Sequence, residues 1–146
     1  MRIRELPGTR IPLHSHPVDE NITVVQGTWY FAVGEKWDRA ALQPLRPGDY
    51  AFAPKGSTMF GYCPDGAIVQ VHGIGPFLIR WCHGLKTLDD KGADSVFTFK
   101  KGDRVEGSRG RGTIRQGYSS GDIIQYEIAL ENGSVVMTDQ SELHRS

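Results

Sequence analysis

Residues 8–27, GTRIPLHSHPVDENITVVQG, hold the densest group of potential metal ligands in this chain. His14, His16 and Glu20 fall within seven residues. In an extended segment side chains alternate between two faces, so His14 and His16 point the same way. A turn through Pro17–Asp19 then brings Glu20 back beside them. Two imidazoles and a carboxylate on one side of a metal ion leave coordination positions open, so the stretch predicts an open metal site.

The spacing of this stretch, Gly8-x5-His14-x-His16-x3-Glu20-x6-Gly27, resembles the first motif of the cupin superfamily at every position. Residues 48–59, GDYAFAPKGSTM, resemble the second cupin motif, Gly-x5-Pro-x-Gly-x2-His, except at the last place. Met59 stands there instead of histidine. The resemblance implies a cupin double-stranded β-helix, a jelly-roll barrel, over residues 1–87.

The same resemblance implies one divalent transition metal ion held by His14, His16 and Glu20. Imidazole and carboxylate donors suit iron, manganese, zinc, nickel or copper, and the sequence does not select among them. Met59 offers a poor donor, and we expect it to pack inside the barrel. His72, on a predicted strand, is the candidate for a fourth ligand. Its alternative is a hydrogen-bonded core histidine.

The rest of the chain predicts an all-β protein, because short apolar runs alternate with Gly/Pro turns and no convincing helix appears. The runs expected as strands in the first part of the chain are 1–5, 22–25, 28–33, 50–53, 67–72 and 77–81. Residues 88–96 are polar and predict a linker. Residues 97–146 carry turn glycines, a long alternating run and an Asn132-Gly133 hairpin signal. Their order resembles small SH3-like barrels of the Tudor and KOW kind.

Composition narrows the partners. Lys and Arg total 17 and so do Asp and Glu, so the sequence does not favour nucleic acid or a membrane surface. Basic side chains from residue 88 onward are matched by acidic ones, so we expect a solvated face there. No apolar run approaches the roughly 18 residues of a membrane span. Cys63 and Cys82 are expected as unrelated thiols in the cytoplasm, although a secretory signal upstream of Met1 is compatible with this sequence.

These patterns predict a metal-binding cupin that binds or transforms a small organic molecule. If it is an enzyme, a dioxygenase-like oxidoreductase or an isomerase fits, with Glu20 as catalytic proton acceptor as well as ligand. The alternative is a non-catalytic binding or interaction protein, with the C-terminal barrel contacting a partner or nucleic acid. A homodimer is expected, because few residues precede the first motif and an uncovered sheet edge would need a partner.

Overall fold

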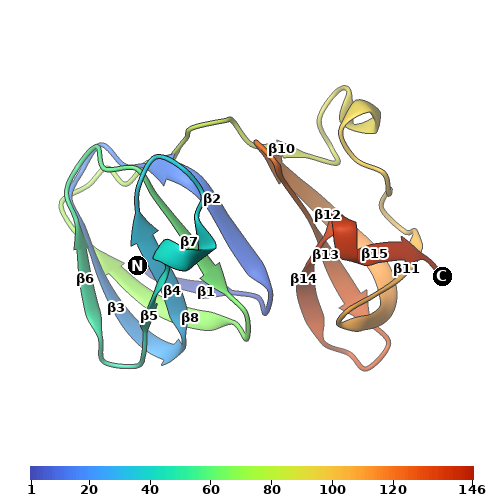
Figure 1. Cartoon of the computed structure of the whole chain (residues 1–146), viewed down its shortest axis with the longest axis horizontal. Coiled ribbons are helices and arrows are strands. Elements are labelled where there is room, and N and C mark those ends of the chain that lie inside the picture. The colour runs from blue at the N-terminus through green and yellow to red at the C-terminus, as the bar shows by residue number, and fades with distance from the viewer. The chain divides into compact units, whose positions relative to one another are not determined.

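The computed structural model describes all 146 residues, and nearly all its regular structure is β-strand (Figure 1). The chain divides into two compact units, Met1–His83 and Gly84–Ser146, which we describe separately. The only helical elements are three short 3-10 turns. The predicted all-β class is therefore confirmed. No helix has the length and hydropathy needed to span a lipid bilayer.

Two antiparallel sheets form the N-terminal unit. A four-stranded sheet has the order β1-β8-β3-β6, and a five-stranded sheet has the order β5-β4-β7-β2-β9. The elements are β1 (Arg2–Glu5), β2 (Thr9–Ser15), β3 (Glu20–Gly27), β4 (Trp29–Val33), η1 (Arg39–Ala41), β5 (Gln43–Leu45), β6 (Tyr50–Ala53), β7 (Met59–Cys63), β8 (Ala67–His72) and β9 (Arg80–Trp81).

The main core of this unit lies between the two sheets. Ile22, Val24, Val69 and Val71 enter it from one sheet, and Trp29 with Cys63 enters it from the other. Alternation along β3 and β8 places every second residue in this layer and turns the residues between them outward. Both cysteines are free thiols, with Cys63 buried and Cys82 exposed.

Gly27, the last residue of the first motif, shows why that motif ends in glycine. Its φ is +76°, and an added Cβ would lie 2.4 Å from the Gly66 carbonyl oxygen. We expect Gly27→Ala to lower the free energy of unfolding by about 3 kcal/mol, since backbone strain and a backbone clash combine. Urea denaturation measures this loss.

Gly48 is the matched control for that experiment. Its φ of +90° is equally left-handed, but an added Cβ would meet nothing within 4 Å. Gly48→Ala should therefore lose only about 1 kcal/mol, the cost of the backbone conformation alone. Equal losses at the two positions would contradict the role given to the close approach between Gly27 and Gly66.

The C-terminal unit is built on a sheet of order β14-β13-β12-β11-β15, with β10 paired to β12. Its elements are β10 (Lys86–Thr87), η2 (Ala93–Ser95), β11 (Arg104–Gly107), β12 (Gly110–Ser120), β13 (Ile123–Leu130), β14 (Val135–Asp139), η3 (Gln140–Glu142) and β15 (Leu143–Arg145). The last strand returns through a 3-10 turn to pair with β11, the second strand of the unit. The SH3-like resemblance stays a prediction, with which this strand order is compatible.

The division of the chain differs from the predicted one. The first unit ends at His83 instead of residue 87, because Lys86 and Thr87 pair with β12 of the second unit. Residues 88–96 were predicted as a linker, but Leu88, Ala93 and Val96 pack against the second core. Three apolar side chains spaced through a polar stretch are too sparse to show as a strand or helix pattern, which is why the sequence suggested a linker.

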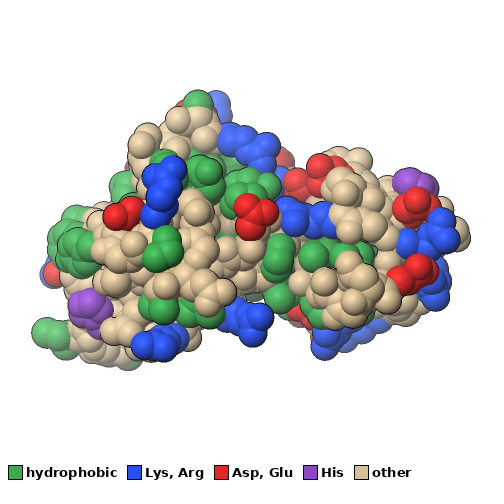
Figure 2. All heavy atoms as spheres, turned by 90° about the horizontal axis from the view of Figure 1, so that it is seen from below, with side chains coloured by type: hydrophobic (Ala, Val, Ile, Leu, Met, Phe, Trp, Pro, Cys, Tyr) green, Lys and Arg blue, Asp and Glu red, His purple; other side chains and the backbone are tan.

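Cations and carboxylates are interspersed over the C-terminal unit, the right-hand part of Figure 2. Arg104 pairs with Glu131 at 2.7 Å, Arg145 with Asp103 at 3.2 Å, and Lys101 with Asp89 at 2.6 Å. Such exposed pairs add little stability, but they neutralise one another.

The predicted homodimer stays a prediction. Tyr50 and Phe52, on the edge strand β6, are among the large exposed apolar side chains.

Candidate functional site

His14, His16 and Glu20 come together inside the N-terminal unit, as the motif predicted. Their side chains are 8%, 3% and 5% exposed. His14 lies on β2, His16 follows the end of that strand, and Glu20 opens β3. The imidazole centroids of His14 and His16 are 4.9 Å apart. His16 Nε2 lies 2.9 Å from Glu20 Oε2.

The turn between the two strands explains why Glu20 and not Asp19 faces the histidines. Asp19 Oδ1 accepts a hydrogen bond from the Lys55 backbone N–H at 2.8 Å. The Gly56 N–H donates to the His16 carbonyl oxygen, also at 2.8 Å. The Pro54–Gly56 turn of the second motif thus holds the first motif in place, and Asp19 is used for that purpose.

Both imidazoles are oriented by backbone carbonyl groups. His14 Nδ1 lies 2.7 Å from the Pro12 carbonyl oxygen, and His16 Nδ1 lies 2.7 Å from the Leu78 carbonyl oxygen. A carbonyl oxygen can only accept, so each Nδ1 is the protonated donor. In the neutral imidazole the lone pair is then on Nε2, which is the usual arrangement of a metal-binding histidine with an outer-shell partner.

The two histidines differ in their affinity for a proton. Burial lowers the pKa of His14, and the neighbouring His16 lowers it further, against weaker opposing effects of Pro12 and Glu20. For His16, burial also disfavours the charged ring, but the hydrogen bond and charge of Glu20, together with the Leu78 carbonyl, outweigh burial and raise its pKa. His14 is therefore the more readily available lone-pair donor, and His16 shares a proton with Glu20.

Aromatic rings cover the histidines. Phe77 stacks on His16, with centroids 4.5 Å apart and planes inclined by 25°. Trp81 lies 5.3 Å from His14 and pairs with it in the β2–β9 register. Phe77 and Leu78 were predicted to be part of a strand, but the strand is only Arg80–Trp81. The Leu78 carbonyl binds His16 instead, which removes it from a sheet ladder.

Met59 packs in the interior, as expected. It is 2% exposed and lies opposite His14 in the β2–β7 register. Together with His14 and Glu20 it lines a small cavity of about 20 Å³. Met59 therefore occupies the place where the second cupin motif has its histidine, with a thioether in place of a nitrogen ligand.

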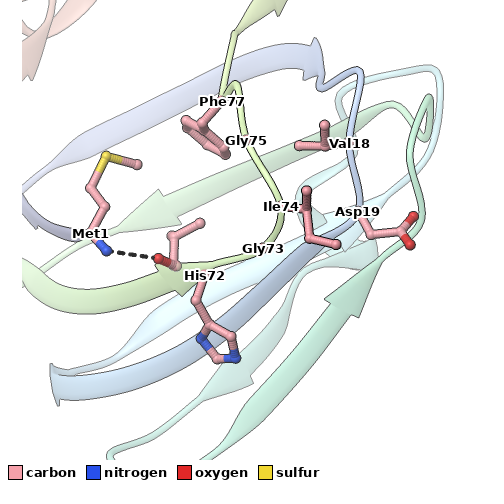
Figure 3. Close-up of a pocket in the computed structure, with 9 residues that line it drawn as sticks. Met1, Val18, Asp19, His72, Gly73, Ile74, Gly75 and Phe77 are labelled. Atoms are coloured by element: carbon pink, nitrogen blue, oxygen red, sulfur yellow. Dashed lines mark hydrogen bonds between the residues drawn. The ribbon is translucent and has the colours of Figure 1, made fainter.

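His72 does not join this group, so its expected role as a fourth ligand is corrected. It is exposed and pairs with Asn21 on β3, whereas Val71 beside it is buried. Alternation therefore puts Val71 inside and His72 on the outer face. Figure 3 shows its imidazole turned away from Phe77, on the far side of the strand.

A larger pocket of about 210 Å³ is lined by Phe77, the residue that stacks on His16 (Figure 3). Its lining is mainly apolar and includes Val18, Ile74 and Phe77 together with Asp19 and His72. Phe77 belongs to this pocket and also stacks on His16, so its ring separates the pocket from the buried imidazole. The sequence indicates this part of the pocket only by an aromatic residue, Phe77, that directly follows the Gly73–Pro76 stretch.

The fit of this site to a metal ion is partial. No group of three or more His, Cys, Asp or Glu side chains is arranged as a metal site in this structure. Glu20 is engaged with His16 instead of facing a common centre. The donor chemistry does fit, since two imidazoles with fixed Nδ1 atoms and one carboxylate are buried together.

Two facing antiparallel sheets over a buried His/His/Glu group define a double-stranded β-helix protein of the jelly-roll class. Residues 1–59 match the family model described as Cupin domain. This match to a cupin domain lies within the N-terminal unit. No curated protein matches the chain.

Solved structures similar to this chain include three proteins. Protein TT1209 of Thermus thermophilus is 26% identical, covers 48% of this chain and 65% of its own, and has a TM-score of 0.39. An uncharacterized conserved protein with a double-stranded beta-helix domain from Klebsiella pneumoniae subsp. pneumoniae is 26% identical, with coverages of 54% and 70% and a TM-score of 0.42. A sugar phosphate isomerase from a cupin superfamily, from Silicibacter pomeroyi, is 17% identical, with coverages of 96% and 66% and a TM-score of 0.39. The chain thus spans 65% of the length of the first of these proteins.

Proposed function

We propose that the cupin domain binds one divalent transition metal ion through His14, His16 and Glu20, and a small organic molecule beside it. The observation that carries this proposal is the pair of carbonyl contacts to His14 Nδ1 and His16 Nδ1. These contacts place the proton of each neutral ring on Nδ1 and leave the Nε2 lone pair available to a metal ion inside a buried site. His16 Nε2 meets Glu20 at 2.9 Å, and a cation between such groups would take the place of the shared proton. A bound metal ion would supply Lewis-acid polarisation of a substrate oxygen.

The residues of the chain supply the remaining chemistry. Glu20, released from His16, is the group that can accept a proton, because it is the only carboxylate beside the two histidines. Phe77 and Trp81 shield the imidazoles from solvent. The neighbouring pocket of about 210 Å³ is where a small, mainly apolar molecule would approach, and Phe77 would have to turn aside to admit it.

Met59 favours a second candidate function, non-catalytic binding of a small molecule. Its thioether fills the position next to His14 and contributes no hard ligand. The two candidates share the same pocket and differ in whether turnover follows binding. The metal-binding candidate requires the His14 and His16 side chains. Non-catalytic binding requires them only if it also uses a metal ion.

Elemental analysis of protein purified without chelator or nickel affinity resin tests the metal site. We expect about one transition metal ion per chain in the wild type and an affinity at least roughly 100-fold lower in the His14→Ala, His16→Ala double variant. His72→Ala is the matched control, because His72 is exposed and lies outside the group. Equal metal content in the wild type and the double variant would refute the site.

A further inference from the structure

Trp29 Nε1 is a buried hydrogen-bond donor that has no acceptor within the protein. Trp29 opens β4 and is 8% exposed. Only one other buried side-chain polar atom of the chain, Ser120 Oγ, lacks a partner within the protein. A buried N–H group without an acceptor costs about 1–3 kcal/mol, so native proteins rarely leave one unmatched. An acceptor that is not part of the protein is the expected explanation.

Trp29 lines a cavity that two of the three site residues, His14 and Glu20, also line. Trp29 lines the cavity of about 20 Å³ together with His14, Glu20 and Gly61. That volume is enough for a single water molecule or hydroxyl group, which needs about 10–15 Å³ in the same measure. Gly61 keeps the space open, since a Cβ there would lie 3.5 Å from Trp29 Nε1 and 3.2 Å from Ile11 Cδ1.

The groups around this cavity define what it can hold. Trp29 can only donate, whereas the His14 Nε2 lone pair can only accept, and Glu20 Oε2 already contacts His16 Nε2 at 2.9 Å. A carbonyl oxygen would satisfy Trp29 and leave His14 Nε2 without a donor. A bare cation would engage His14 Nε2 and leave Trp29 without an acceptor, whereas an oxygen bound to such a cation could accept from Trp29. In the metal-free protein an O–H group satisfies both residues, because its oxygen accepts from Trp29 and its proton is donated to His14.

We propose that Trp29 is a specificity-determining residue that recognises the oxygen of one O–H group in this cavity. In the absence of a ligand that group is a water molecule, and in the complex it is a hydroxyl of the small organic molecule. The ligand part rests on the proposed small-molecule site, whereas the water part rests on the cavity and Trp29 alone. The substrate class is therefore a small hydroxylated compound.

Nuclear magnetic resonance of metal-free, 15N-labelled protein tests the water part. Trp29→Phe assigns the indole N–H signal of Trp29 by its disappearance. We expect dipolar cross-relaxation between that proton and water, distinguished from chemical exchange by its sign in the rotating frame. Gly61→Ala, which narrows the cavity but keeps the indole, should abolish it. A Trp29 indole proton without water contact in the wild type would overturn the proposal.

Two small probes test the ligand part on the same signal. Ethane-1,2-diol should shift the Trp29 indole resonance, and 1,2-dimethoxyethane, which has oxygens but no O–H, should not. Equal shifts would overturn the hydroxyl assignment, and no shift with either would overturn the ligand part and leave the bound water.

Zinc binding provides a second readout and separates this proposal from the metal site. Trp29→Phe should weaken Zn²⁺ binding roughly 10-fold through loss of an outer-shell partner. Trp37→Phe is the matched control, because Trp37 packs on the Phe60 ring but does not itself line the cavity. Unchanged affinity in Trp29→Phe would overturn the link between Trp29 and the site. If Zn²⁺ does not bind the wild type at all, the proposed metal site is refuted. The cross-relaxation between water and the Trp29 indole proton then still tests the proposed role of Trp29.

Discussion

Replacing Tyr126 with phenylalanine is expected to lower the free energy of unfolding of the C-terminal unit by about 2–4 kcal/mol. Tyr126 is fully buried, and its hydroxyl oxygen accepts hydrogen bonds from the Thr98 and Phe99 backbone N–H groups at 3.1 and 3.2 Å. The hydroxyl also donates to Gln140. Burial raises the pKa of Tyr126, so the proton needed for that bond stays in place.

The loss arises because phenylalanine keeps the packing and removes the acceptor. The rings of Phe97 and Phe99 lie 5.8 and 5.5 Å from that of Tyr126, so the vacated space stays apolar. The Phe99 N–H would be left buried with no acceptor. Hydrogen exchange of the β13 amides measures the opening free energy of this unit by itself.

Tyr118→Phe is the control for this experiment, since Tyr118 lies on β12 and is only partly buried. We expect it to change the opening free energy by less than about 0.5 kcal/mol. If Tyr126→Phe costs no more than Tyr118→Phe, the buried hydroxyl does not organise the segment from Thr98 to Phe99.

Glu5→Gln is expected to stabilise the N-terminal unit at pH 8 by up to about 3 kcal/mol and to have little effect at pH 4.5. Burial raises the pKa of Glu5 from 4.5 to about 7. A carboxyl group with a raised pKa in the folded protein favours folding when it is protonated. That contribution is complete below pH 4.5, is lost as the pH rises towards about 7, and is absent at pH 8.

The difference in free energy between Glu5→Gln and the wild type isolates this group from the others that titrate. Urea denaturation followed by tryptophan fluorescence reports the N-terminal unit, because Trp29, Trp37 and Trp81 all lie within it. Glu35→Gln is the control, since Glu35 is exposed. A difference that is the same at pH 4.5 and pH 8 would show that Glu5 ionises without cost in the folded protein.

Much of the fold and of the site could be predicted because the deciding interactions are local. His14, His16 and Glu20 are brought together by alternation along one strand and a turn of three residues. Gly27 needs a left-handed backbone, and its place in the motif shows where β3 ends. The hairpin at Asn132-Gly133 forms as predicted, but its turn is not the type I′ turn that Asn-Gly favours, because Gly133 has a positive φ and Asn132 does not. None of these features requires knowledge of distant residues.

Tertiary structure alone decided which face of each strand is inside and what covers the site. A period of two tells which residues share a face, but not which face is buried, so His72 could be placed in the barrel on sequence grounds although it lies outside. The Leu78 carbonyl reaches His16 across 62 positions, and the Tyr126 hydroxyl reaches Thr98 across 28. Such contacts leave no periodic trace in the sequence, because they depend on where the folded chain returns and not on local backbone preferences.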